Sequence, residues 1–348
     1  MAESRAEVAV LGASGYTGAE LVRLLARHPR LRIGALTAER QAGKPLAAVF
    51  PHLAAARAPD LVKIDDVDFG RMDAVFCALP HATTQAVIKA LPAGLKVVDL
   101  SADFRLRDPA LYERVYGHVH QAPDLQEIAA YGLTEHYRDA VQGTRLVANP
   151  GCYTTTSELP LIPLLKERLI DPDDIVIDAK SGVSGAGRDA KQGSLFSEVG
   201  ESFAAYGVAT HRHGPEIDQC LADFAGRPVT VAFTPHLVPM SRGIFATIYV
   251  ELAQGVSPGD LHARLEAAYA DEFFVRVLPF AETTATQHVR GTNFCHIAVH
   301  PDRRPGRAIL LSVTDNLVKG ASGQALQNLN LMLGFDERAG LEQLALFP

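Results

Sequence analysis

Residues 7–18 read EVAVLGASGYTG, and this stretch decides the fold. Its first five residues are mostly apolar and partly β-branched, which favours a buried strand. Gly12, Gly15 and Gly18 follow directly. Because glycine lacks a Cβ, the turn can be tight and can approach a pyrophosphate, with the amides of the next helix facing the negative charge. A plain strand-to-helix turn would use the same glycines, but the place at the first strand favours a dinucleotide-binding βαβ unit.

The pattern continues outward from this unit to about residue 147. Further apolar strands are predicted at 32–37, 73–79 and 96–100, and helical spacing is present at 83–91. Strands that alternate with helices predict a parallel sheet.

After Cys152 the pattern of predicted elements changes, because strand-like segments follow one another with few helices between them. They lie at 176–180, 229–233, 244–252, 273–277, 293–299 and 308–314, and a helix is predicted at 322–333. Adjacent strands of this kind predict an antiparallel or mixed sheet. The expected fold class is therefore α/β, with a Rossmann-type dinucleotide-binding domain plus an α+β domain.

Composition narrows the class of protein. The chain has 348 residues, of which 47% are hydrophobic and 21% charged, as in a two-domain globular protein. A net charge of −7 gives no basic face to nucleic acid or membrane. Four scattered cysteines without a CxxC pair argue against a disulfide framework or a zinc site. With no signal peptide and no long apolar run, we expect a cytoplasmic protein.

The end of the second predicted strand bears on cofactor choice. Glu39 is placed to bind a ribose 2′-hydroxyl, which favours NAD, whereas Arg40 is placed to meet a 2′-phosphate, which favours NADP. Arg40 is equally compatible with a solvated loop charge. These residues alone leave the choice open.

Cys152 lies in NPGCYTTT, where Pro and Gly force a turn and the threonines favour a following helix. A cysteine at a helix start is a candidate thiolate nucleophile, because the helix dipole favours the anion. The alternative is a small buried hydrophobe, which we prefer for Cys77 and Cys295 in their apolar strands.

A thiolate needs an acid/base partner, and His211 and His213 in HRHGPEI are candidates. No third ligand at a convincing spacing supports a metal site there. His118 and His120 repeat the HxH pattern in a Gly- and Pro-rich stretch and are expected to be loop residues. Alternatively, His211 and His213 lie in a polar loop without a catalytic role, which enters a helix at Pro215.

Two further segments are candidates for holding an anion. SGVSGAGR, residues 181–188, follows a predicted strand and is flexible enough to wrap a ligand, with Arg188 as a cation, although a surface hairpin is equally compatible. Arg105 follows the strand at 96–100, and ligands bind beyond the carboxyl ends of such strands. A surface ion pair of Arg105 with Asp103 or Asp108 is the alternative.

Taken together, six motifs in order over about residues 7–335 resemble the N-acetyl-γ-glutamyl-phosphate reductases of arginine biosynthesis, in their longer form. The motifs are GASGYTGAELVRLL, DLSADFR, NPGCYTT, KSGVSGAGR, HRHGPEI and DNLVKGASGQALQN. That family is similar to aspartate-semialdehyde dehydrogenase and glyceraldehyde-3-phosphate dehydrogenase. The resemblance implies an NADP-binding domain of residues 1–150 plus about 318–348, and a catalytic and oligomerisation domain of residues 151–317.

The resemblance also implies site roles. Cys152 matches the nucleophile, and the acid/base histidine is placed at His211 with His213 as the rival. Cofactor contacts are expected at Gly12, Ser14, Gly15, Tyr16, Thr17, Gly18, Arg40, Ser184, Gly185, Asn316, Lys319 and Gly320. Substrate contacts are expected at Arg105, Ser181 and Arg188, and no metal is expected.

The implied reaction is NADPH-dependent reduction of N-acetyl-γ-glutamyl phosphate through a cysteine thioester, by a homodimer or homotetramer. Two alternatives stay open at this point. One is the lysine-biosynthesis reductase that acts on an aminoadipyl phosphate borne by a carrier protein. The other is a non-catalytic NADP-binding regulator, against which the presence of both Cys152 and HRH argues.

Overall fold

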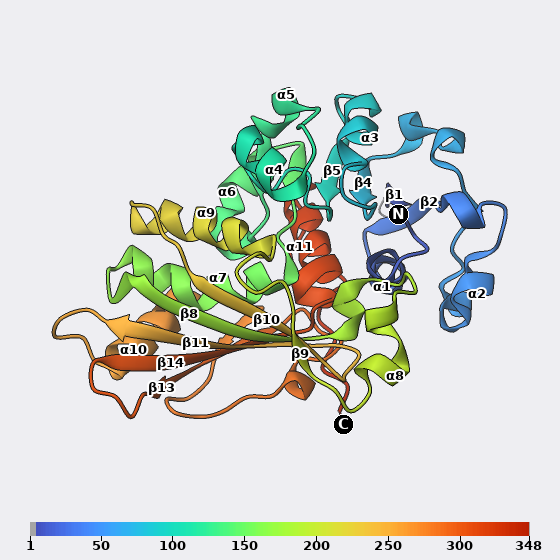
Figure 1. Cartoon of the computed structure of the whole chain (residues 1–348). Coiled ribbons are helices and arrows are strands. Elements are labelled where there is room, and N and C mark those ends of the chain that lie inside the picture. Colours follow the sequence, from blue (N-terminus) through green and yellow to red (C-terminus); the bar gives the residue numbers. More distant parts are fainter. Residues whose placement is uncertain (1–4, 348) are drawn as a thin grey trace. The chain divides into compact units, whose positions relative to one another are not determined.

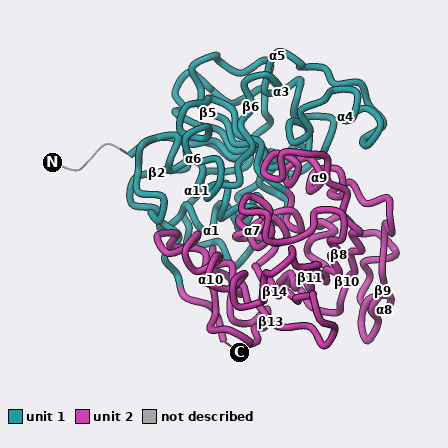
Figure 2. The backbone as a smooth tube through the Cα atoms, turned by 90° about the vertical axis from the view of Figure 1, so that its left-hand side faces the viewer, with its two compact units in different colours: residues 1–150, 321–343 teal, residues 151–320, 344–348 magenta. Residues whose placement is uncertain are grey.

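The computed structural model describes residues 5–347, which divide into two units. Unit 1 comprises the residues up to Pro150 together with Ala321–Gln343, and unit 2 comprises Gly151–Gly320 with the tail from Leu344 (Figure 2). The resemblance placed the whole stretch from about residue 318 in the first domain. Here the chain returns to unit 1 at Ala321, and Leu346 in the tail pairs with Arg290 of unit 2 through its backbone amide.

Unit 1 is built on a parallel sheet with the strand order β3-β2-β1-β4-β5-β7-β6 (Figure 1). Its strands are β1 (Ala6–Leu11), β2 (Leu31–Thr37), β3 (Leu61–Val62), β4 (Ala74–Cys77), β5 (Lys96–Asp99), β6 (Ala129–Tyr131) and β7 (Leu146–Ala148). Every pairing in this sheet is parallel. The order reverses between β1 and β4, as in a Rossmann fold, which confirms the predicted fold class.

The helices of unit 1 connect these strands. They are α1 (Tyr16–Leu25), α2 (Leu46–Val49), α3 (Thr84–Ala90), α4 (Pro109–Tyr116), α5 (Pro123–Gln126), α6 (Thr134–Gly143) and the late α11 (Gly323–Met332). All of α11 is buried although it contains four amide side chains. Asn328 among them donates to Gly132 O at 2.7 Å and accepts from Thr134, so α11 is bonded into unit 1 rather than only packed on it.

Unit 2 is built on a mixed sheet with the order β12-β13-β14-β11-β8-β10-β9. Its strands are β8 (Ile170–Gly182), β9 (Ala204–Ala205), β10 (Ala232–Val238), β11 (Ile244–Leu252), β12 (Val275–Val277), β13 (Cys295–Pro301) and β14 (Arg307–Thr314). The β8–β10 and β12–β13 pairs are parallel and the other pairs are antiparallel. The predicted mixed second sheet is therefore confirmed.

The two faces of this sheet differ. The helices of unit 2 are α7 (Cys152–Lys166), α8 (Phe196–Val199), α9 (His213–Ala225) and α10 (Pro258–Tyr269), and α7 and α10 pack on one face. In β11, Ile244, Ala246, Ile248 and Val250 point to that face and are fully buried. The alternate residues of the same strand, Phe245, Thr247 and Tyr249, are only partly buried.

Candidate functional site

The first turn of unit 1 forms a cradle of backbone. Gly12 has φ +86°, and a Cβ added there would lie 2.3 Å from Ala78 O. A Cβ on Gly18 would lie 2.4 Å from Gly12 O. Helix α1 starts at Tyr16, and its N-cap residue is Gly15, which has no side chain to cap the first amides. Those amides suit a dinucleotide phosphate, so this loop fits the expected cofactor.

The loop after β2 separates the roles of its two charged residues. Glu39 already accepts a long hydrogen bond, 3.4 Å, from the amide of Ile64. Arg40 is exposed, and its side chain has no hydrogen bond or ion pair within the described residues 5–347. This arrangement leaves a cation at the end of β2 where a 2′-phosphate is read in such folds.

Cys152 is the first residue of α7, with Gly151 as the N-cap. Of the four cysteines, all within the described residues, Cys152 alone is partly exposed, and Cys77, Cys220 and Cys295 are buried. Burial raises the pKa of the Cys77 thiol well above its ordinary value. Gly320 lies so close to Cys152 that an added Cβ would be 2.8 Å from the Cys152 Cβ. By position and access, Cys152 is the cysteine that best fits the expected thiolate.

The turn before Cys152 is held by a residue that the motif reading did not single out. Glu216, in the first turn of α9, is fully buried. Its Oε1 accepts from the amide of Gly151 at 2.8 Å and lies 3.0 Å from the hydroxyl of Thr154. A sequence signal was present, because Glu216 follows HRHGP directly, but only the fold brings the residue to Gly151.

His211 sits inside a cluster of rings. Its Nδ1 accepts from the amide of His213 at 3.1 Å. Burial, followed by the positive charge of Arg212, lowers the pKa of His211 to about 4. The rings of Tyr153, Tyr206, His213 and Phe233 surround it, with centroids 4.7–5.6 Å away. His211 is therefore neutral near pH 7 and fixed in orientation.

Two phenols link this cluster to the sheet. Tyr206 donates to the hydroxyl of Tyr153 at 3.1 Å, and Tyr153 donates to His236 O at 3.0 Å. Burial raises the pKa of Tyr206 to about 12 and that of Tyr153 still further. Both phenols therefore stay protonated in the working pH range and serve as donors.

The glycine-rich loop after β8 gathers several of the expected ligand contacts in unit 2. Asn316 donates to Ser184 Oγ at 2.9 Å and accepts from the amide of Gly243 at 2.8 Å. A Cβ added to Gly185 would lie 3.0 Å from Ser181 Oγ. Arg188 is exposed. Lys319 is fully buried, with Nζ 5.9 Å from the centre of the Phe274 ring.

Arg105 lies in unit 1 and is tied to the main chain. Its Nε donates to Asn149 O at 2.8 Å and its Nη2 to Leu100 O at 3.0 Å, and only 7% of the residue is exposed. Arg105 is therefore a buried residue and not a surface one. Nearby, burial raises the pKa of Asp99 to about 7. His120, expected in a loop, is buried with its Nε2 3.0 Å from Asp103 O.

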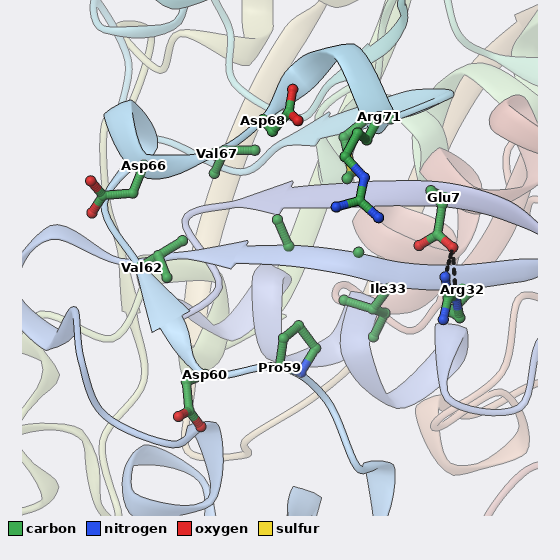
Figure 3. A pocket seen from close by; sticks show the side chains of 13 residues that line it. Glu7, Arg32, Ile33, Pro59, Asp60, Val62, Asp66, Val67, Asp68 and Arg71 are labelled. Carbon is green, nitrogen blue, oxygen red and sulfur yellow. Dashed lines mark hydrogen bonds and ion pairs between the residues drawn. The ribbon is translucent and has the colours of Figure 1, made fainter.

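A pocket of about 470 Å³ lies along the amino-terminal half of β2. Figure 3 shows Arg71 pointing into it, with the Glu7–Arg32 ion pair at one end. None of the expected site residues lines this pocket. Within residues 5–347, no group of three or more His, Cys, Asp or Glu is arranged to hold a metal ion, and no helix is long and apolar enough to cross a membrane.

Comparison with known proteins covers nearly the whole chain. Residues 7–144 match the family profile described as "Semialdehyde dehydrogenase, NAD binding domain", and residues 152–316 match "Semialdehyde dehydrogenase, dimerisation domain". An N-acetyl-gamma-glutamyl-phosphate reductase of Rhodospirillum rubrum is 60% identical over 99% of both chains. A probable chloroplastic N-acetyl-gamma-glutamyl-phosphate reductase of Arabidopsis thaliana is 59% identical over 99% of this chain and 86% of the relative.

Solved structures show the same fold at low identity. An aspartate semialdehyde dehydrogenase II from Vibrio cholerae, complexed with ASA, aligns with a TM-score of 0.72 at 16% identity, over 95% of this chain and 99% of that one. An aspartate semialdehyde dehydrogenase from Candida albicans, solved with NADP, aligns with a TM-score of 0.69 at 17% identity, over 97% and 99% of the two chains.

Proposed function

The chain belongs to the N-acetyl-γ-glutamyl-phosphate reductase family, and from that premise we propose which of its residues carry the reaction. The protein is an oxidoreductase of arginine biosynthesis. It reduces N-acetyl-γ-glutamyl phosphate to N-acetylglutamate 5-semialdehyde with NADPH and releases phosphate. We propose the roles of its site residues, its oligomeric state and its cellular compartment.

Cys152 is the nucleophile of the proposal, supported most by its place at the start of α7 as the one partly exposed cysteine among the four. An acyl phosphate is already activated, so the thiolate attacks the acyl carbon and phosphate leaves, which gives a thioester. NADPH supplies the hydride that reduces this thioester. The resulting thiohemiacetal on Cys152 collapses to the aldehyde and the thiol, with a histidine moving the proton.

His213 is the acid/base group of the proposal, and His211 positions it. Sequence reasoning favoured His211, with His213 as the rival. A proton shuttle needs a pKa near the working pH, whereas the pKa of His211 is lowered to about 4. His211 also uses its Nδ1 to accept the amide of His213, which fixes the entry of α9. Both observations favour His213 for the proton.

Two phosphate groups of the cofactor have different partners in the proposal, namely main-chain amides for the pyrophosphate and a cation for the 2′-phosphate. Amides of the loop Gly12–Gly18 bind the pyrophosphate, aided by Ser14, Tyr16 and Thr17. Arg40 pairs with the 2′-phosphate, because Glu39 is already engaged with Ile64. Ser184, Gly185, Asn316, Lys319 and Gly320 are the further cofactor contacts of the proposal.

The substrate anions are assigned to Arg105, Ser181 and Arg188. Arg105 follows the carboxyl end of β5, and hydrogen bonds to the carbonyl oxygens of Asn149 and Leu100 fix the place of its guanidinium group there. Ser181 and Arg188 bracket the loop after β8. A phosphate and a carboxylate are both bound well by such donors.

The assembly is a homo-oligomer built on the sheet face of unit 2 that α7 and α10 leave uncovered. Tyr249 pairs with Ile309 across β11 and β14 on this face, beside Phe245, and all three are partly exposed. A contiguous face of this kind suits a second copy. Tyr249→Asp should shift the mass in solution, measured by light scattering, towards that of the monomer.

Four free cysteines suit a reducing compartment, and we assign the chain to the cytoplasm.

One assay tests the catalytic proposal. Purified protein receives N-acetylglutamate semialdehyde, phosphate and NADP, and NADPH absorbance reports the reverse reaction. Cys152→Ser should lose turnover and keep NADP affinity, with Cys77→Ser as the buried-cysteine control. A Cys152→Ser variant that keeps more than about a tenth of the rate, a loss under roughly 1.4 kcal/mol, would exclude the covalent route.

A further inference from the structure

Glu216 is a fully buried carboxyl group placed at the start of the helix that carries the nucleophile. It accepts the amide of Gly151, the residue that caps α7. The hydroxyl of Thr154 has one proton and two acceptors in reach, Gly151 O at 2.6 Å and Glu216 Oε1 at 3.0 Å. The carboxyl group therefore closes the turn on either side of Cys152.

The charge of this group opposes that of the helix end. Helix α7 runs for 15 residues, and its first amides present partial positive charge that favours a thiolate at Cys152. A buried anion beside Gly151 acts in the opposite direction, because low-dielectric surroundings strengthen the repulsion between two negative charges. Glu216 therefore fixes the geometry of the turn and, by its charge, opposes the effect of the helix dipole on the Cys152 thiol.

We propose that Glu216 is a positioning residue for Cys152, which fixes the Gly151–Thr154 turn and keeps the thiol less acidic than the helix end alone would make it. This inference rests on the proposed role of Cys152. It explains why an acceptor-only group is buried at a helix start, where a neutral cap would satisfy the same amide. A thiol that ionises only with the help of a base stays protected from oxidation between turnovers.

Other ionisable groups surround this turn within unit 2, and their charge states bear on the test. They are Tyr153 and Tyr206, His211 and His213, Arg212, Glu158 within α7, and Asp315 and Lys319 beside Gly320. The two phenols stay protonated and His211 stays neutral between about pH 6 and 9, given their shifted pKa values. The experiment therefore follows the alkylation of Cys152, and the Glu216 variants change the charge beside it.

The test is the rate of Cys152 alkylation by iodoacetamide against pH, followed by intact mass on the full chain with and without NADP. In Glu216→Gln the amide oxygen still accepts from Gly151 but the charge is gone, so the midpoint should fall by roughly one unit. Glu216→Asp keeps the charge and should keep the wild-type midpoint. Asp218→Asn, which removes a carboxyl group from the same helix, should leave the midpoint unchanged.

The outcomes are distinct. A Glu216→Gln midpoint within about 0.2 units of wild type would show that Glu216 only satisfies buried donors, and the proposal would fail. If Glu216→Gln does not fold, the Glu216→Asp and Asp218→Asn midpoints decide, because either one moving by a full unit contradicts the proposal. Failure of the catalytic role itself is separate, since Cys152→Ser would then keep turnover whatever the alkylation midpoints are.

Discussion

Helices α1 and α7 begin in the same way, but their first turns have different proposed functions. Each follows a glycine N-cap, Gly15 in one and Gly151 in the other, with no side-chain cap bond from that residue. At α1 the first turn contains no acidic residue, so its amides suit an anion. At α7 the cap amide is already bound by Glu216, and the first helical residue is Cys152. The same local motif therefore fits an anion at α1 and the proposed nucleophile at α7, according to which other residues of the unit contact it.

The largest expected effect tests the α7 end through its histidines. His213→Asn should slow turnover by about 10²–10⁴-fold, the usual scale of acid–base catalysis. His211→Asn should slow turnover much less, because an imidazole with a pKa near 4 is a poor proton shuttle at the working pH. Turnover rates of both variants measure this. If the larger loss follows His211→Asn, the roles are reversed.

The α1 end is broken by filling its cradle. Gly18→Ala places a Cβ 2.4 Å from Gly12 O and 2.7 Å from Ala13 Cα, where main chain cannot yield easily. Overpacking of this kind costs about 1–3 kcal/mol, so NADP should bind roughly 10–100-fold more weakly. Titration calorimetry checks the affinity. Gly94→Ala, which meets no atom within 4 Å, is the control, and alkylation of Cys152 should be unaffected in both.

A smaller effect is expected at Arg40, which is proposed to distinguish NADP from NAD, whereas the loop Gly12–Gly18 would bind both. Arg40→Ala should weaken NADP by about tenfold, the scale of one charge-assisted bond, and leave NAD nearly unchanged. The ratio of kcat/KM for the two cofactors reports this directly. An equal loss for both would mean that Arg40 supports the loop rather than the 2′-phosphate. Arg57, also outside the sheet, offers a matched Arg→Ala control.

The smallest effect concerns the far end of α1. His28 Nδ1 accepts the amides of Arg30 and Leu31, and burial, the largest cause, lowers the pKa of His28 below 6.5. The unfolded chain therefore binds more protons just below pH 6.5, and stability should fall as pH drops through that value. His28→Asn should flatten this dependence of stability on pH, because asparagine does not titrate. Melting temperatures from pH 7.5 to 5.5, with His118→Asn as the exposed control, would show no difference in slope if the idea is wrong.

How much the sequence predicts differs between the same two regions. The α1 loop is local, so EVAVLGASGYTG was sufficient for its strand, turn and helix. Cys152 and the histidine pair were also found locally, but Glu216, Tyr153 and Tyr206 acquire their roles only when α7, α9 and β10 meet. Interactions between residues 62 positions apart, such as Glu216 with Thr154, leave no periodic signal in the chain.

Two boundary errors have physical causes of the same kind. The strand predicted at 229–233 is β10, Ala232–Val238, because Pro235 reads as a breaker yet occupies a paired position opposite Ala179. The strand predicted at 176–180 extends back to Ile170 through DPDD, which reads as a turn. In both cases sheet pairing outweighed local preference.

The closeness of Gly320 to Cys152 has a consequence for how the chain could be cut and rejoined. Unit 2 leaves unit 1 after Pro150 and hands the chain back at Ala321, and its two ends meet, with an added Gly320 Cβ only 3.2 Å from Cys152 Cα. Within unit 1 the two cut ends also meet, because Asn149 donates to Ala321 O at 3.1 Å. Apart from the tail from Leu344, unit 2 is therefore one continuous segment inserted at a single point of unit 1. Cys152 is the second residue of that segment, so the proposed nucleophile and the whole sheet of unit 2 could be exchanged together by cutting the chain at two neighbouring points.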